Sequence, residues 1–231
     1  MIVEKKVDKI TTLEEALEQI NDGCTLMFGG FGGVGNPPLL IKGMLDKGVK
    51  NVTLIGNDAA FPEIGIGRFV SQGRAKKLIA SHIGSNPIAG KLMTEGKMEV
   101  EFSPQGILVE RIRAGGAGLG GILSDIGVGT MIEEGKQKVT VNDKEYLVET
   151  PLTADVSIVY AKKADPYGNL VFDKSARNTN PLVAMAGTIT IAEVEEIVPL
   201  GELDPECIVT PGIYVDMVIQ SKGVDWKWAW E

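Results

Sequence analysis

A glycine-rich stretch that follows a short apolar segment is the part of this sequence best suited to binding a ligand. Residues 25–28 have the character of a strand, and Pro37 and Pro38 can open a helix that ends at Gly48. Glycine lets the backbone approach a ligand closely, and the first helical turn offers unpaired N–H groups in a positive field. This order predicts a site for an anion such as a phosphate. The residues of the predicted loop are Gly29, Gly30, Phe31, Gly32, Gly33, Val34 and Gly35.

One interpretation of this loop is a dinucleotide site. Residues 30–35 fit the pattern G-x-G-x-x-G, and Asp58 follows a second predicted strand at about the ~20-residue spacing of a ribose-binding acid. Together they are compatible with an NAD-dependent oxidoreductase. A single match to so short a pattern indicates phosphate binding more than a nicotinamide cofactor, and a tight turn without any ligand is the alternative.

Gln105 is the second candidate for chemistry. Ser103 can cap and Pro104 can begin a helix that runs to Arg113, which would place Gln105 in its first turn. The Gln105 amide and the neighbouring backbone N–H groups would then point out of the helix end. Such donors stabilise a carbonyl oxygen as it gains negative charge. A glutamine that faces solvent at a helix start is the other interpretation.

Other residue types point to catalysis less strongly. His82 is the only histidine, and no G-x-S-x-G motif accompanies it, so a Ser/His/Asp hydrolase is not indicated and His82 is predicted to be structural. Cys24 directly precedes a strand, which predicts an inert core thiol. No cluster with the spacing of metal ligands is visible, so no metal is expected. Two runs of glutamates are typical of a solvated face: Glu133 and Glu134, and Glu193, Glu195 and Glu196.

Alternating strands and helices must position these candidates. Strands are predicted at residues 52–55, 77–80 and 98–102, and helices at 13–20, 64–70 and 87–95. This rhythm predicts an α/β fold: a mostly parallel, doubly wound sheet with flanking helices. Ligands collect beyond the carboxyl ends of such strands. The segments expected there are residues 29–35, 57–58, 81–82 and 103–105.

The rhythm changes after Arg113. Residues 115–121 indicate a second glycine-rich loop, and two strand-like runs around Asn142 and Asp143 predict a β-hairpin on a small flap. Further strands are predicted at residues 155–161, 170–172, 188–192 and 196–198, with a helix at 181–186.

The last residues carry all three tryptophans, at positions 226, 228 and 230. A segment that docks on a neighbouring subunit is favoured over a frayed end, because exposed indole rings are costly.

The amino-acid composition limits the classes of protein to which this chain can belong. The 231 residues are enough for one large domain, which we expect to span residues 1–231. A net charge of −8 argues against nucleic acid as a partner, so a polyanionic ligand would need local donors. No apolar run reaches the ~18–20 residues that span a bilayer. Without a signal peptide or a disulfide framework in view, we expect a cytoplasmic protein.

Several segments together resemble the family I coenzyme A transferases. Residues 22–31, followed by Gly35, Asn36 and Pro37, are similar to the first signature of that family. Segments similar to its α-type half follow in the family's order at residues 103–106, 110–118, 127–130, 149–152 and 174–178. The resemblance extends from about Thr12 to about Asp216 and is closest to α subunits that act on short-chain acyl groups.

The resemblance implies an enzyme that moves coenzyme A (CoA) between a short-chain acyl-CoA and a carboxylate such as acetate, acetoacetate or butyrate. It implies a glutamyl-CoA thioester whose glutamate lies on a β subunit, in a Ser-Glu-Asn-Gly motif that this sequence lacks. CoA is then substrate and covalent intermediate, no tightly bound cofactor is expected, and the assembly would be α2β2. By position, residues 29–35 would bind CoA and Gln105 would help hold the thioester oxygen. An NAD-dependent oxidoreductase and a non-catalytic ligand-binding subunit stay open as alternatives.

Overall fold

A mostly parallel sheet carries the fold in the computed structural model, which describes residues 8–229 and residue 231. Its strands follow the order β11-β10-β8-β1-β2-β3-β4, every neighbouring pair in that path is parallel, and β9 pairs antiparallel with β8. The strands are β1 (Thr25–Phe28), β2 (Val52–Ile55), β3 (Ala75–Ala80), β4 (Glu99–Phe102), β8 (Ala154–Ala164), β9 (Leu170–Val171), β10 (Gly187–Ile197) and β11 (Met217–Gln220). The predicted fold class is confirmed.

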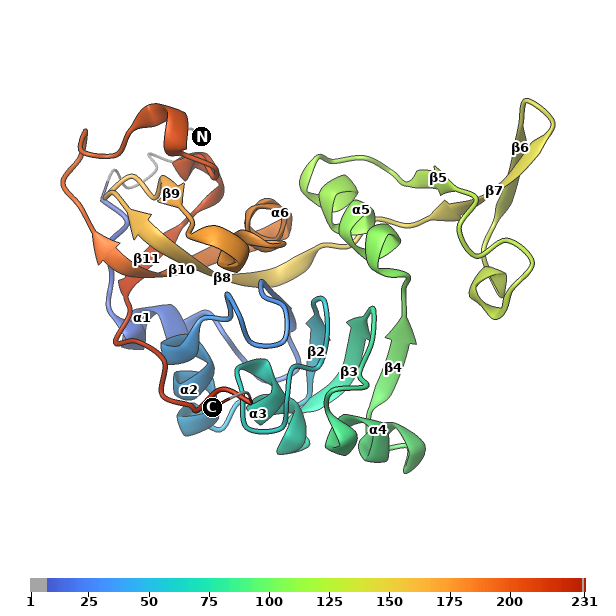
Figure 1. Ribbon diagram of the computed structural model, residues 1–231, viewed down its shortest axis with the longest axis horizontal. Coiled ribbons are helices and arrows are strands. Elements are labelled where there is room, and N and C mark those ends of the chain that lie inside the picture. The colour runs from blue at the N-terminus through green and yellow to red at the C-terminus, as the bar shows by residue number, and fades with distance from the viewer. Residues whose placement is uncertain (1–7, 230) are drawn as a thin grey trace.

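Helices cover both faces of this sheet (Figure 1). On one face lie α1 (Leu13–Glu18), α2 (Pro38–Lys47), α3 (Ile66–Ser71) and α4 (Pro87–Thr94); on the other lie α5 (Gln105–Gly116) and α6 (Asn180–Ala186). Local signals set several of these ends. Thr12 closes a capping box with Glu15 at the start of α1, and Gly48, at φ +80°, ends α2 in the left-handed region.

The predicted hairpin belongs to a separate three-stranded antiparallel sheet, in the order β5-β7-β6, which projects from the main body (Figure 1). Its strands are β5 (Ile122–Ser124), β6 (Lys138–Val141) and β7 (Lys144–Glu149). Asn142 and Asp143 form the turn with φ values of +49° and +59°, as a two-residue hairpin requires. Four 3₁₀ turns complete the described elements: η1 (Met131–Glu133), η2 (Lys174–Arg177), η3 (Pro205–Cys207) and η4 (Gly212–Tyr214).

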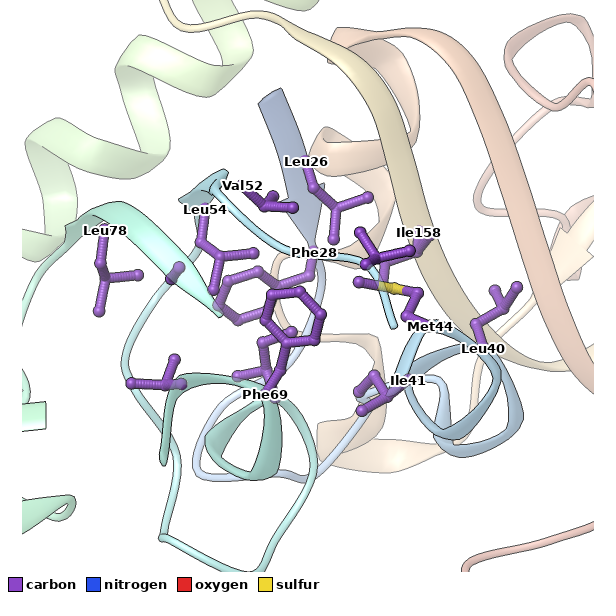
Figure 2. Packing of buried hydrophobic residues seen from close by; sticks show 14 of the residues in the cluster. Leu26, Phe28, Leu40, Ile41, Met44, Val52, Leu54, Phe69, Leu78 and Ile158 are labelled. Atoms are coloured by element: carbon purple, nitrogen blue, oxygen red, sulfur yellow. The ribbon is translucent and has the colours of Figure 1, made fainter. Parts of the chain in front are cut away.

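Alternate residues of β1 belong to two hydrophobic clusters, one on each face of the sheet. Leu26 and Phe28 pack towards α2 and α3, where the Phe28 ring lies among aliphatic side chains and near Phe69 (Figure 2). Met27 packs on the opposite face with residues of α5 and α6. Both faces of β1 are therefore buried, which fixes the point where the glycine-rich loop leaves the sheet.

Three local expectations were wrong. Gly115 and Gly116 end helix α5 instead of opening a loop, because a Cβ on Gly115 would lie 2.0 Å from the Leu152 carbonyl oxygen, so glycine permits close packing there. The two strands predicted at 188–192 and 196–198 are one continuous strand, β10, which ends at Ile197 and has Glu193 buried within it. Ser103 does not cap α5: its N–H continues the sheet by bonding to the Ala80 carbonyl at 3.0 Å.

Candidate functional site

The carboxyl ends of β1 to β4 bring the predicted loops together at one edge of the sheet. Asn57 and Asp58 follow β2, and Asp58 pairs with His82, which follows β3, through a parallel bridge. Gln105 starts α5 after β4 and donates from Nε2 to Asn57 Oδ1 at 2.7 Å. The sheet thus joins segments that the sequence separates, as predicted for a doubly wound fold.

A cavity of about 570 Å³ opens at this edge. Gln105 and Asn57 line it together with Gly30 and Phe31 of the glycine-rich loop. The remaining lining residues are Gly106, Ile107, Val109, Glu110, Asn178 and Thr179. The wall is thus partly apolar and partly built from amide side chains, which suits a neutral carbonyl group better than a bare ion.

The start of α5 faces this cavity with unused donors. The first intrahelical bond of α5 runs from Leu108 N–H to the Pro104 carbonyl at 2.8 Å, so the N–H groups of Gln105, Gly106 and Ile107 precede it. Within the described residues no side chain caps this helix. Gln105 is exposed, as the solvent-facing alternative predicted. Its amide is nevertheless held in place by the hydrogen bond to Asn57. The helix end can therefore offer several N–H groups to one carbonyl oxygen.

A chain of hydrogen bonds links Gln105 to the glycine-rich loop. Asn57 Nδ2 donates to Asp58 Oδ2 at 2.7 Å, and the Asp58 carboxylate accepts the Gly32 N–H at 3.0 Å. Asp58 also accepts the Ala60 N–H at 2.7 Å and is 2% exposed. The Asp58 carboxylate is buried, and its oxygens already accept hydrogen bonds from this chain. Asp58 therefore holds the loop in place and is not available to bind a ribose. The geometry gives the dinucleotide interpretation no support.

The predicted anion site at the start of α2 is wrong, because a side chain already occupies it. The Glu193 carboxylate, fully buried, accepts the N–H groups of Leu39 at 2.9 Å and Leu40 at 3.0 Å. It also accepts the Ser221 hydroxyl at 2.5 Å. Burial raises the pKa of Glu193 to about 7. In the glutamate run that predicted a solvated face, Glu195 and Glu196 are indeed exposed, whereas Glu193 supplies an internal helix cap.

Most backbone N–H groups of the glycine-rich loop also have partners within the chain. Phe31 and Val34 bond to each other in both directions at 2.9 Å, as a tight turn does. The Gly29 N–H reaches the Ile158 carbonyl at 3.1 Å, and the Gly30 N–H reaches Asn178 Oδ1 at 3.0 Å. The loop is thus a preformed wall of the cavity, and its glycines serve its shape more than the binding of a phosphate.

Three asparagines outside the predicted site residues hold this loop in place. Asn36 Nδ2 donates to the Gly29 carbonyl at 2.7 Å, and Asn178 Nδ2 donates to the Val34 carbonyl at 3.0 Å. Asn180, fully buried, donates to the Gly35 carbonyl at 3.0 Å. Sequence reasoning missed them as site residues, because asparagine is ordinary in loops and two of these contacts span about 145 positions. Asn36 and Asn178 do lie in the segments that carried the family resemblance.

A second cavity of about 480 Å³ lies next to the larger one. Phe31 and Asn178 line both cavities, and Val34 also lines the second one. Its other lining residues come from the turn η2: Lys174, Ser175 and Arg177.

The remaining candidates have structural surroundings. His82 stacks at a tilt against Phe31, with 6.1 Å between ring centroids, and its Nδ1 lies 3.3 Å from Ser81 Oγ. Cys24 is half-buried, and burial raises the pKa of its thiol, which disfavours the nucleophilic thiolate. Among residues 8–229 and 231, no His, Cys, Asp and Glu side chains gather into a group that could hold a metal ion.

The tryptophan-bearing tail contacts its own chain. A Cβ on Gly33 would lie 3.3 Å from the Trp228 ring, and Trp226 meets Trp228 edge to face with centroids 5.8 Å apart. Asp225 pairs with Arg68 of α3 at 2.7 Å. Trp230 lies outside the described residues, and docking on a neighbouring subunit stays a prediction.

Comparison with known proteins identifies the family to which this chain belongs. The model of the family described as "Coenzyme A transferase" matches residues 10–221. The chain is 59% identical over 224 residues to a probable coenzyme A transferase subunit alpha of Bacillus subtilis, covering 96% of this chain and 98% of that one. It is 45% identical over 213 residues to the acetoacetyl-CoA:acetate/butyrate CoA transferase alpha subunit of Clostridium acetobutylicum, covering 92% and 98%.

A solved structure is similar over most of this chain. It is the acyl-CoA transferase of Escherichia coli O157:H7 in a thioester complex with CoA, with a TM-score of 0.83 and 26% identity. The match covers 93% of this chain and 47% of that one, so this chain spans about half the length of that transferase. Among the described residues, no helix has both the length and the apolar character needed to cross a membrane.

Proposed function

This chain belongs to the coenzyme A transferase family as an α-type chain, and from that premise we propose that it is half of a heteromeric enzyme. The enzyme would move CoA between a short-chain acyl-CoA and a carboxylate. The catalytic nucleophile would come from a β subunit, because this chain lacks the Ser-Glu-Asn-Gly motif that carries it. This chain matches about half the length of the solved Escherichia coli transferase, which supports a division of the enzyme into two chains.

The observation that carries the proposal is the open start of α5 at the larger cavity. Gln105, Gly106 and Ile107 line that cavity at the uncapped first turn of α5, and Asn57 fixes the Gln105 amide. A thioester carbonyl placed there would receive these donors as its oxygen gains charge. Well-aligned donors of this kind contribute roughly 3–4 kcal/mol each to the transition state. Gln105 is thus the proposed catalytic residue of this chain.

The proposed reaction passes through a thioester on the partner subunit. The carboxylate of the partner's glutamate gives one oxygen to the acyl group and takes the CoA sulfur, so a free carboxylic acid anion leaves and a glutamyl-CoA thioester remains. The acceptor carboxylate then gives an oxygen back to the glutamate and takes the sulfur, which regenerates the glutamate. The Escherichia coli relative was solved as a thioester complex with CoA, which supports a covalent step of this kind.

The loop of residues 29–35 is the proposed CoA-binding segment. Gly30 and Phe31 line the cavity beside Gln105, and the asparagine bonds described above keep the loop close against it. Since its backbone donors are mostly used internally, we infer that the loop binds the slender pantetheine arm by shape. CoA is therefore a substrate here and not a resident cofactor.

Acetate, acetoacetate and butyrate are the proposed substrates, on the strength of the Clostridium acetobutylicum relative's name. We propose a dimer of αβ pairs as the assembly, which light scattering of the purified complex would test. A cytoplasmic location is also proposed, because Cys24 and Cys207 are both free thiols, as a reducing compartment keeps them.

A transfer assay from acetoacetyl-CoA to acetate tests the proposal. It compares this chain alone, a β subunit alone and the two coexpressed chains, and transfer is expected only from the coexpressed pair. Mass spectrometry of that pair after acetoacetyl-CoA treatment without acceptor should find the CoA adduct on the β chain. Transfer by this chain alone, or an adduct on it, would contradict the half-enzyme. If Gln105→Ala left the pair's activity unchanged, a non-catalytic ligand-binding subunit would be favoured.

A further inference from the structure

The smaller cavity carries two basic side chains that the proposed reaction does not use. Lys174 and Arg177 line it, and it shares Phe31 and Asn178 with the larger cavity, which Gln105 lines. The two cavities are therefore adjacent, and Phe31, which is 52% exposed, belongs to the wall of both. A ligand bound at Gln105 could thus extend along Phe31 to the basic pair.

These two side chains are positively charged, whereas the chain as a whole has a net charge of −8. Arg177 has no acidic partner within residues 8–229 and 231. The Lys174 Nζ lies 3.5 Å from Asp173, in a pair whose lysine side chain is 86% exposed. The acid of the larger cavity, Glu110, is paired with Arg113 at 2.7 Å. The smaller cavity thus offers net positive charge, and solvated pairs such as Lys174–Asp173 exchange partners readily.

The turn that carries the basic pair is fixed to the glycine-rich loop. Lys174 and Asn178, at its two ends, have φ values of +45° and +24°, a region that non-glycine residues seldom occupy. Asn178 keeps this conformation by accepting the Gly30 N–H and donating to the Val34 carbonyl, each at 3.0 Å. Strained backbone that the surroundings hold in place is concentrated at ligand sites. The turn η2 therefore presents its cations at a defined position beside the loop.

We propose that Lys174 and Arg177 form an anion subsite for a substrate whose reacting carbonyl lies at Gln105. This inference rests on the proposed function and adds to it a place for a charged group of the substrate. The phosphates of CoA are the charged groups that fit, because the single carboxylate of an acceptor such as acetate is its reacting group. Phosphate presents oxygen pairs that a guanidinium fork can bind in a bidentate way, and a lysine adds a point charge.

The test replaces Arg177 by glutamine in the coexpressed αβ complex, with Lys174→Gln as a second variant. We expect the KM of acetoacetyl-CoA to rise about tenfold, as the loss of a charge-assisted hydrogen bond predicts, with kcat little changed. Arg177→Lys should recover part of the loss, because it keeps the charge without the fork. Acetoacetyl-CoA and acetoacetyl-pantetheine, which lacks the phosphates, serve as alternative donors.

The two donors test whether phosphates occupy the subsite. If they do, the Arg177→Gln effect appears with acetoacetyl-CoA and vanishes with acetoacetyl-pantetheine. A KM for acetate that rises equally with both donors would overturn a subsite for phosphates. Arg74→Gln is the matched control, since Arg74 precedes β3 at the opposite edge of the sheet. Variants that all keep the wild-type KM values for both substrates would overturn the subsite.

Calorimetric titration of the complex with CoA and with acetate gives a readout that does not depend on turnover. A wild-type complex that binds CoA more tightly than the Arg177→Gln complex, yet transfers nothing, would refute the proposed function and support the subsite. If the wild-type and Arg177→Gln complexes bind CoA with equal affinity and also bind acetate with equal affinity, the subsite is refuted. The proposed function still stands in that case, provided that the wild-type complex is active.

Discussion

Gln105 Nε2 donates a hydrogen bond to Asn57 Oδ1 over 2.7 Å, although the two residues are 48 positions apart in the chain. Asn57 in turn bonds to Asp58, and Asp58 to the Gly32 N–H. The donor at the start of α5 and the glycine-rich loop are therefore parts of one hydrogen-bonded unit. A change at Asn57 should therefore act on catalysis through the orientation of Gln105.

Gln105→Ala should lower kcat of the αβ complex by about 10²-fold, as the loss of an oxyanion donor does. Asn57→Ala should lower kcat less, and the double variant should be little worse than Gln105→Ala, because both changes remove the same oriented donor. Steady-state kinetics of the three variants give the comparison. Losses that simply add would indicate that Asn57 does not work through Gln105. Circular dichroism spectra that match the wild type exclude misfolding as the cause.

Gly30→Ala should destabilise the chain far more than Gly73→Ala. Both glycines have positive φ, +122° and +67°, but a Cβ on Gly30 would lie 2.0 Å from Asn36 Nδ2, whereas Gly73 has open space around it. We expect a loss of about 1 kcal/mol at Gly73 from backbone strain and roughly 3 kcal/mol or more at Gly30, where a clash is added. Urea denaturation measures both. Equal losses would mean that the loop can move away from Asn36.

Glu193→Gln should remove a dependence of stability on pH. The pKa of Glu193 is raised from its ordinary 4.5 to about 7, chiefly by burial, and the nearby Asp225 charge acts in the same direction. The Ser221 hydroxyl and the N–H groups of Leu39 and Leu40 oppose this rise. Between these pH values the folded state holds a proton that the unfolded state has released. The stability due to this proton is therefore full below pH 4.5 and is lost as pH rises through about 7.

The measurement is the free energy of unfolding of wild type and Glu193→Gln at pH 4.5 and pH 8. Relative to wild type, the variant should gain roughly 3 kcal/mol over this interval. The exposed Glu202 provides the control substitution, Glu202→Gln, which should follow the wild type. A constant difference between Glu193→Gln and wild type would show that Glu193 does not titrate there.

Trp228→Ala should loosen the glycine-rich loop, because the Trp228 ring lies against Gly33. We expect faster amide hydrogen exchange for residues 29–35, measured by mass spectrometry of peptides, with exchange in β3 unchanged. Val224→Ala is the control: Val224 is in the same tail but lines a cavity with Leu39 and Lys42. Equal exchange of the loop in wild type and Trp228→Ala would show that the tail does not support it.

Local sequence signals were enough to predict the elements that carry the site. The apolar run of β1 and the prolines at the start of α2 affect only neighbouring residues. The same holds for Gly48 at φ +80° and for the Asn142-Asp143 turn, so short-range rules apply to all of them. The alternation of strands and helices was also sufficient for the parallel sheet, and with it for the edge at which residues 29–35, Asn57 and Gln105 meet. That much the sequence determined by itself.

Only the tertiary structure decided which polar groups meet at this edge. The start of α2 looked open to an anion, yet Glu193 caps it from 153 positions away from Leu40. Asp58 looked free for a ligand, yet it accepts the Gly32 N–H, and Asn178 reaches Gly30 across 148 positions. A buried N–H group takes whichever acceptor the packed fold brings within about 3 Å, and that partner is set by strand order and loop packing. No local pattern encodes it, which is why the donors at Gln105 remained available and those at α2 did not.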